Sequence, residues 1–245
     1  MLRSTYSFGA SVVGPLHQRE QRPNEDAWLR SAGSYGSLVV VCDGMGSRPE
    51  ARRGAKAACL AAREAVSRWS RVQGAPLSYL AHLVELLWRL RIYPVDPGDA
   101  ATTCLLALAC PDGAWVLGGV GDGLAIAKTG SNLTIVVGQR GEDFGNETLG
   151  LGVSKGSGSW KLVTLPASVE DRVAVLATDG IADDLVPEKI NDFCDWLVVD
   201  FQNLKPADRW RQLMMELKDW PTPNHLDDKT LAVLRTTATS QGPSS

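Results

Sequence analysis

The stretch VVVCDGMG (39–46) changes character abruptly in its middle. Its first half is a run of apolar, strand-forming residues, and Asp43-Gly44 follow directly. Because the run is continuously apolar, we predict a strand over residues 37–42 with both faces covered. A turn is one explanation of the Asp-Gly pair, since both residues are frequent in turns. A metal site is another, because a strand-end carboxylate beside a bare backbone suits an ion.

The composition indicates one large domain with ample material for a core. The chain has 245 residues, of which 44% are hydrophobic and 22% charged, and its formal net charge is −3. We see no basic stripe and therefore expect no nucleic-acid or membrane partner. The five cysteines form no CxxC pair, which favours buried thiols in a reducing cytoplasm. The N-terminus lacks the apolar core of a signal peptide, and no segment reaches the roughly 18 apolar residues of a membrane span.

The hydrophobic patterns predict strands and helices in separate blocks. We expect strands at residues 6–13, 27–31, 37–42, 102–109, 114–120, 124–128, 133–137, 173–178 and 230–235. We expect helices at residues 49–69, 76–90, 187–199 and 206–219. The strands over residues 102–137 suggest an antiparallel meander. Since β-α-β alternation and a Gly-rich nucleotide loop are both absent, we predict an α+β fold of antiparallel sheets covered by helix pairs.

Acidic residues occur at the ends of predicted strands in five places. These are Asp43, Asp122 and Asp179, each followed by glycine, together with Asn24-Glu25-Asp26 and Asp227-Asp228. Turn preference explains any one of them, but five together favour convergence at one edge of packed sheets. Converging carboxylates repel one another and raise each other's pKa values, and polyvalent cations relieve that repulsion.

The types of side chain in these places favour a hard metal ion. Oxygen ligands without histidine or cysteine select Mg²⁺ or Mn²⁺. The three histidines, His17, His82 and His225, share no motif, and we interpret each as structural or solvent-exposed. Two divalent ions held close together lower the pKa of a bound water and neutralise phosphoryl charge. The residues alone therefore predict a divalent-metal site suited to phosphoryl hydrolysis.

Seven blocks of the chain resemble those of the protein phosphatase 2C family, the metal-dependent serine/threonine phosphatases, and they occur in the family's order. They are RPNEDAW (22–28), VVVCDGMGS (39–47), ATTCLLALA (101–109), GGVGDGLAIAKTG (118–130), NETLGLG (146–152), LATDGIADDL (176–185) and DDKTLAVL (227–234). The resemblance spans residues 22–235. It implies an α-β-β-α sandwich of two antiparallel sheets with metals at one edge. We place the catalytic domain at residues 1–236 and a disordered tail at residues 237–245.

The resemblance also implies a role for each residue of the site. Asp43 would bridge two Mn²⁺ or Mg²⁺ ions, with the Gly44 carbonyl on one of them. Asp179 and Asp227 would complete one ion's shell, and Asp26 would serve the other, with Glu25 nearby. Asp122 would face a third, weaker metal position, whereas Thr103 and Asp228 would support the site. Metal-bound water would attack phosphoserine or phosphothreonine in a phosphoprotein, the substrate of a serine/threonine kinase, and we expect a cytoplasmic monomer.

The chain departs from the family pattern at several positions. The phosphate-binding arginine of the family falls at Gln21, so Arg22 or Arg19 would have to replace it. Asp228 stands where asparagine is usual, and Gly123-Leu124 replace a Ser-Arg pair. Ser47 replaces a glycine, and Met45 occupies the position of a general-acid histidine in some eukaryotic members. Residues 128–146 are short for the family's flap over the site, which implies a more open site.

Three functions remain open on this evidence. The first is an active metal-dependent protein phosphatase. The second is a catalytically weak or inactive relative that binds phosphoproteins or a regulatory partner, which the substitutions at Gln21 and Leu124 suggest. The third is a metal-dependent hydrolase of small phosphate esters, which a short flap would favour.

Overall fold

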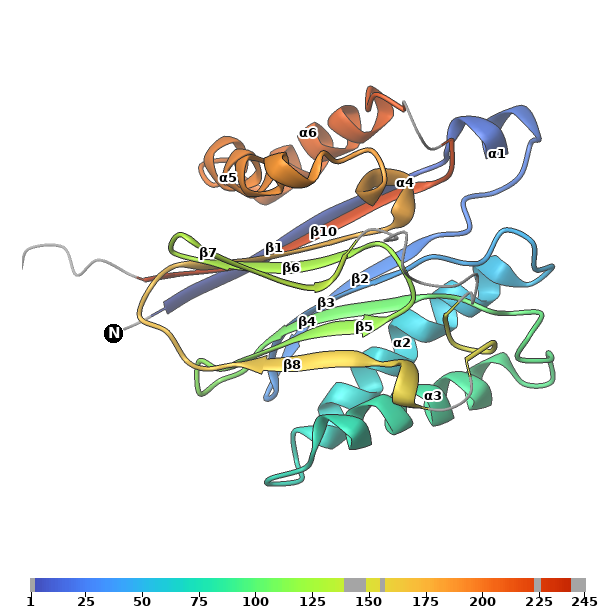
Figure 1. Cartoon of the computed structure of the whole chain (residues 1–245), viewed down its shortest axis with the longest axis horizontal. Coiled ribbons are helices and arrows are strands. Elements are labelled where there is room, and N and C mark those ends of the chain that lie inside the picture. Colours follow the sequence, from blue (N-terminus) through green and yellow to red (C-terminus); the bar gives the residue numbers. More distant parts are fainter. Residues whose placement is uncertain (1–2, 139–148, 155–156, 223–225, 239–245) are drawn as a thin grey trace, which may run out of the picture.

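Two antiparallel sheets stack face to face, and a layer of helices covers the outer face of each (Figure 1). The computed structural model describes residues 3–138, 149–154, 157–222 and 226–238. Each sheet has five strands among these residues. The predicted α-β-β-α sandwich is therefore confirmed.

The first sheet joins the two ends of the described chain. Its strands, in spatial order, are β1 (Arg3–Val12), β10 (Lys229–Ala238), β9 (Arg172–Ala177), β6 (Leu124–Thr129) and β7 (Asn132–Val137). Strands β1 and β10 pair along their full length, from Arg3 opposite Ala238 to Val12 opposite Lys229. Residues 237 and 238 therefore belong to the sheet, not to the tail that we predicted from residue 237.

The second sheet contains the strand of the opening motif near its centre. Its strands, in spatial order, are β2 (Ala27–Gly33), β3 (Gly36–Cys42), β4 (Cys104–Ala109), β5 (Trp115–Val120) and β8 (Lys161–Leu165). Side chains of β3 alternate between two apolar clusters: Leu38, Val40 and Cys42 face the helices, whereas Val39 and Val41 face the other sheet. Both faces of this strand are covered, as its continuous apolar run predicts.

The helices lie in two pairs on opposite sides of the sheets. Helices α2 (Ala51–Trp69) and α3 (Leu77–Ile92) cover the second sheet, and α5 (Ile190–Phe201) and α6 (Pro206–Lys218) cover the first (Figure 1). Helix α2 is rich in alanine on its buried side, which lets it lie close to β2 and β3. Two short helices, α1 (Pro15–Arg19) and α4 (Asp179–Ala182), sit at one edge of the sandwich.

The chain crosses from one sheet to the other between β5 and β6, so the predicted four-stranded meander is wrong. Strands β4 and β5 pair in the second sheet, and β6 and β7 pair in the first. The crossing turn contains Gly121 and Gly123, whose φ angles of +109° and +103° favour glycine. A local pattern of strands and turns does not distinguish such a crossing from a hairpin. The short elements α1, α4 and β8 were also not predicted.

Some predictions fall outside the described residues. Residues 139–148 and 155–156, in the Gly-rich segment that includes the predicted flap, are among them, as are His225 and residues 239–245 of the tail. Within the part of the chain that the structure describes, no helix combines the length and apolar character needed to cross a membrane.

Candidate metal centre

Acidic residues from four distant segments meet at the edge of the sandwich that carries α1 and α4. Asp26 directly precedes β2 and Asp43 directly follows β3, and the register that pairs Ala27 with Cys42 makes them neighbours. Asp179 begins α4 directly after β9, and Asp227 precedes β10. Because β9 and β10 are adjacent strands of the facing sheet, the stacking of the two sheets brings both pairs together.

Two of these carboxyl groups have pKa values that the neighbouring carboxylates raise. Burial is the largest cause that raises the pKa of Asp43 well above its usual value, and the nearby carboxylates of Asp26, Asp179 and Asp227 raise it further. Burial also raises the pKa of Asp26, with further contributions from Asp228 and Asp179. Negative charge is therefore concentrated in a partly buried space, which favours a cation.

Asp26 is held by a chain of hydroxyl groups. Its side chain is 6% exposed, and its Oδ2 accepts a 3.0 Å hydrogen bond from Oγ1 of Thr178. The same hydroxyl accepts the backbone N–H of Thr230 at 3.1 Å, which ties Asp26 to β9 and β10 at once. At the backbone, the N–H of Asp26 donates to the side chain of Asn24 at 2.9 Å. The carboxylate is thus oriented by both sheets.

Asp43 is fixed in place through its backbone. The N–H of Asp43 donates to Oγ1 of Thr103 at 2.9 Å, and the Asp43 carbonyl accepts the Thr103 N–H at 2.8 Å. The hydroxyl of Thr102 donates to the same carbonyl at 2.7 Å. These contacts agree with the supporting role that we expected for Thr103.

The glycines that follow the aspartates allow backbone segments to approach closely. A Cβ atom on Gly44 would lie 2.6 Å from the Ala51 carbonyl oxygen and 2.8 Å from that of Glu25. A Cβ atom on Gly180 would lie 2.1 Å from the carbonyl oxygen of Asp228. The Asp-Gly pattern is therefore more than a turn signal, because the missing side chain is what lets the acidic loops converge.

Asp122 lies in the turn between β5 and β6 and is partly buried. The flanking Gly123 lies so close to β9 that a Cβ atom there would be 2.5 Å from the Ala177 carbonyl oxygen. Asp122 is not among the groups with the largest effects on the pKa of Asp26 or Asp43.

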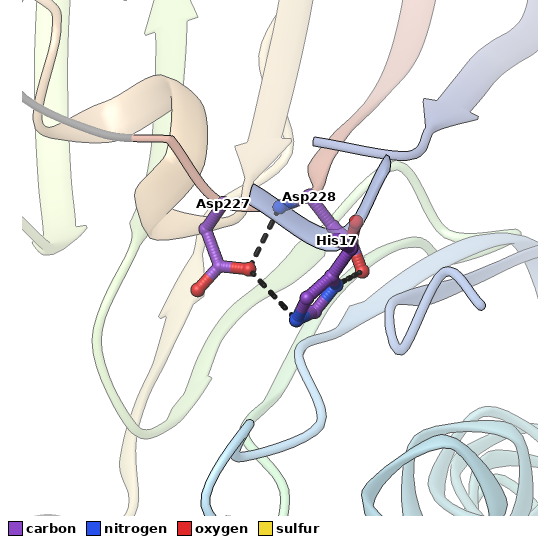
Figure 2. A group of neighbouring side chains, drawn as sticks. All are labelled: His17, Asp227 and Asp228. Carbon is purple, nitrogen blue, oxygen red and sulfur yellow. Dashed lines mark hydrogen bonds and ion pairs between the residues drawn. The ribbon is translucent and has the colours of Figure 1, made fainter. Parts of the chain in front are cut away.

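His17 and Asp228 form a buried pair at the edge of the cluster (Figure 2). His17 is 2% exposed, and its Nδ1 lies 2.9 Å from Oδ2 of Asp228. The Nε2 atom lies 3.9 Å from Oδ1 of Asp227. The solvent-exposed alternative for His17 is therefore wrong. No sequence signal links the two partners, which are separated by 211 positions.

Arg22 reaches the site, whereas Arg19 does not. The Arg22 guanidinium donates to both carboxylate oxygens of Glu25, at 2.9 and 3.0 Å, and to the Gly46 carbonyl at 2.8 Å. The hydrogen bond to Glu25 is the largest cause that shifts the pKa of Arg22, and it raises that pKa. Arg19 is exposed and makes no hydrogen bond or ion pair with the described residues. Gln21 has φ +56°, a left-handed conformation that turns the chain so that Arg22 points to Gly46.

The donor set of the central cluster fits divalent cations. Asp26 and Asp179 are 6% and 7% exposed, and like-charged groups buried together are costly unless a cation compensates them. All four central side chains offer oxygen atoms, which Mg²⁺ and Mn²⁺ prefer. The buried amino group of Lys229 donates to the Asp227 carbonyl at 3.1 Å, and burial lowers the pKa of this lysine. Lys229 thus offsets the negative charge only in part.

Comparison with known proteins places this architecture in a defined class. A sequence profile of the family described as Protein phosphatase 2C matches residues 13–220. Members of this family are metal-dependent serine/threonine protein phosphatases. The chain belongs to the protein phosphatase 2C family. No curated protein sequence matches the chain significantly.

Solved structures share the fold at low sequence identity. The catalytic domain of the serine/threonine protein phosphatase PstP, in complex with two manganese ions, has 18% identity and a TM-score of 0.63, covering 96% of this chain and 100% of that one. A bacterial serine phosphatase has 20% identity and a TM-score of 0.67, covering 95% and 98%. PppA, a key regulatory component of T6SS in Pseudomonas aeruginosa, has 20% identity and a TM-score of 0.64, covering 95% and 97%.

Proposed function

We propose that this protein is an active metal-dependent serine/threonine protein phosphatase. The observation that supports this function best is the convergence of Asp26, Asp43, Asp179 and Asp227 at one edge of the sandwich. Asp26 and Asp179 are buried there, and Asp43 and Asp227 are partly buried. Such a cluster is costly in a folded protein unless it binds cations. Membership of the protein phosphatase 2C family supports the same conclusion.

The proposed site assigns separate tasks to the residues of this chain. Asp26, Asp43, Asp179 and Asp227, with the Gly44 carbonyl, would hold two ions, Mn²⁺ or Mg²⁺, and Asp122 would serve a weaker third position. When bound, such ions activate water and neutralise charge on the phosphoryl group. Thr178 and Thr103 keep the carboxylates in place before substrate binds. Preorganisation of this kind avoids rearrangement during the reaction.

Arg22 is the cation that we assign to the substrate phosphate. Its guanidinium contacts the Gly46 carbonyl, directly beyond the loop that carries Asp43. The hydrogen bonds to Glu25 would position this group, and the remaining donors would face the phosphate. Glu25 and Asp228 then support the site from behind, since Glu25 N–H donates to Asp228 Oδ2 at 2.6 Å.

The finer identity of the substrate is also part of the proposal. We infer a phosphoserine or phosphothreonine protein that a serine/threonine kinase has modified, with the phosphatase acting as a cytoplasmic monomer. The PstP structure, which contains two manganese ions, supports Mn²⁺ as the first metal to test.

Hydrolysis of a phosphothreonine peptide tests the proposal directly. The purified protein should release phosphate with Mn²⁺, and EDTA should abolish the release. A small aryl phosphate serves as the comparison, because turnover of this ester alone would favour a small-molecule hydrolase. Absence of turnover of either substrate with Mn²⁺ or Mg²⁺, in folded protein, would contradict catalysis.

One observation favours a second candidate, a relative that binds phosphoproteins without hydrolysing them. The Arg22 guanidinium is already bonded to Glu25, to Gly46 and, at 3.3 Å, to Glu20, so its capacity for a phosphate is reduced. Calorimetry with the same phosphopeptide would separate the two candidates. Tight binding without turnover would support the binding protein.

A further inference from the structure

His17 is positioned by three contacts that join the start of α1 to the segment before β10. The Leu16 N–H donates to the Leu226 carbonyl at 3.0 Å, and the Gly14 N–H donates to Asp228 Oδ1 at 2.8 Å. The imidazole itself is bonded to Asp228 Oδ2. His17 is therefore held by the backbone of its neighbours and by its own side chain. The edge of the ring that carries Nε2 faces Asp227, as Figure 2 shows.

The hydrogen bonds of Asp228 determine which ring nitrogen carries the lone pair. Oδ1 of Asp228 accepts the Gly14 N–H, and Oδ2 accepts the Glu25 N–H, so the group acts as a carboxylate acceptor on both sides. The Nδ1 of His17 must then donate its proton to Oδ2. In the neutral ring this leaves the lone pair on Nε2.

The Nε2 atom points into the acidic cluster without a hydrogen bond. Its distance of 3.9 Å to Asp227 Oδ1 is too long for one, and no other described residue bonds to it. Oδ1 of Asp227 accepts the backbone N–H of Asp228 at 2.8 Å. The lone pair of a residue that is only 2% exposed thus lies beside a carboxylate that the proposed function assigns to a metal ion. Nε2 of His17 and the Asp227 carboxylate can each offer a lone pair to a metal ion. A cation between them would therefore bind both.

We propose that Nε2 of His17 is a ligand of the divalent ion that Asp227 holds, with Asp228 orienting the ring from behind. A ligating histidine almost always donates its other N–H to a carboxylate or carbonyl, which is the arrangement seen here. Asp228 is then the orienting group and not a ligand, because both its oxygens are occupied. The proposal rests on the proposed function only in requiring that an ion binds at Asp227.

A nitrogen ligand changes which metal the site prefers. Carboxylates alone suit Mg²⁺ and Mn²⁺, whereas imidazole favours the later divalent metals such as Co²⁺ and Zn²⁺. The site should therefore discriminate against Mg²⁺ more strongly than an all-oxygen site does. Asp228, which stands where asparagine is usual in the family, and His17 beside it would act together in this preference.

Pulsed electron paramagnetic resonance of the Mn²⁺-loaded protein tests the ligand directly. The expected result is a ¹⁴N coupling to bound Mn²⁺ that changes to a ¹⁵N pattern after growth with ¹⁵N-histidine. The coupling should vanish in His17→Asn and persist in the control His82→Asn, since His82 is exposed on α3. Bound Mn²⁺ without nitrogen coupling, or coupling that survives in His17→Asn, would refute the histidine ligand and leave the phosphatase proposal standing. Absence of any bound Mn²⁺ would refute both.

Metal affinities measured by calorimetry provide a second readout that is independent of catalysis. His17→Asn should lower the affinity for Co²⁺ by at least about tenfold and change that for Mg²⁺ much less. Asp228→Asn should weaken Co²⁺ binding in the same direction, because it removes the carboxylate that orients the ring. An equal loss for Co²⁺ and Mg²⁺ would mean that His17 only supports the loops. If the variants do not fold, bound Mn²⁺ that shows no histidine coupling in the unaltered protein still refutes the proposal.

Discussion

Oγ1 of Thr178 donates a 3.0 Å hydrogen bond to the carboxylate of Asp26, although 152 positions separate the two residues. The same oxygen accepts the Thr230 N–H, so one hydroxyl links a metal-ligand candidate in one sheet to two strands of the other. The carboxylate cluster is therefore built across the interface between the sheets. Any change that separates the sheets at this edge should also disperse the cluster.

Replacement of Thr178 by valine should weaken metal binding and lower stability together. The substitution keeps the shape but leaves the Thr230 N–H and one oxygen of Asp26 without their partner, which costs about 1–3 kcal/mol. Thr178→Ser, which retains the hydroxyl, is the matched control and should behave nearly as the unaltered protein. Denaturant unfolding and Mn²⁺ calorimetry would measure both effects. Unchanged Mn²⁺ affinity in Thr178→Val would show that Asp26 does not depend on this bond.

Asp43→Asn should abolish phosphatase activity and Mn²⁺ binding without unfolding the protein. An outer-shell partner of a metal site typically contributes about 10–100-fold to affinity, and loss of a charged ligand should exceed that. Asp179→Asn should act in the same way. Asp192→Asn, an exposed position on α5, is the control for loss of one negative charge. Full activity in Asp43→Asn would mean that the cluster is not the metal site.

The metal-free protein should lose stability as pH rises from about 5 to about 7.5. Burial and neighbouring carboxylates raise the pKa values of Asp26 and Asp43 in the folded state above their ordinary value of 3.8. The unfolded chain then binds fewer protons than the folded one in this range, so the free energy of unfolding falls with increasing pH. Added Mn²⁺ should reverse the loss, because it binds the ionised cluster.

Thermal unfolding with EDTA at both pH values, and again with Mn²⁺, would measure this effect. Asp43→Asn should show a smaller fall in Tm between the two pH values, because one of the interacting carboxylates is gone. A Tm that increases with pH in EDTA, with the same slope in Asp43→Asn, would contradict a repulsive cluster.

Arg22→Ala should raise KM for a phosphopeptide more than it lowers kcat. A residue that binds the phosphate in the ground state and the transition state alike contributes mainly to KM. Arg19→Ala removes an equal charge from an exposed position and serves as the control. If Arg19→Ala raised KM and Arg22→Ala did not, the phosphate would lie nearer to α1.

Gly180→Ala should disturb the site through the backbone alone. The added Cβ atom would lie 2.1 Å from the Asp228 carbonyl oxygen, so the segment before β10 must move. We expect a loss of stability of about 1–3 kcal/mol and weaker Mn²⁺ binding. Gly158→Ala is the control, since a Cβ atom there meets no atom within 4 Å. Equal stability and equal Mn²⁺ affinity of the two variants would show that the segment at Gly180 and the segment before β10 can move apart without disturbing the site.

The sequence by itself determined the central strands and the acidic residues of the site. The apolar run before Asp43 predicts a strand covered on both faces, because the run is short and its valines favour a strand over a buried helix. The aspartates at strand ends indicated a divalent-metal site, and the resemblance of seven blocks to the protein phosphatase 2C family implied a metal-dependent phosphatase. These signals are local in the sequence, so they can be recognised without knowledge of how the chain folds.

Only the tertiary structure decided where the chain crosses from one sheet to the other and which side chains surround the carboxylates. The crossing between β5 and β6 depends on the φ angles of Gly121 and Gly123, and the sequence does not report them. The pairing of His17 with Asp228 arises because α1 docks beside the segment before β10. Contacts between residues so far apart follow from the packing of the two sheets and not from local preference. The sequence therefore could not show that His17 lies beside the acidic residues.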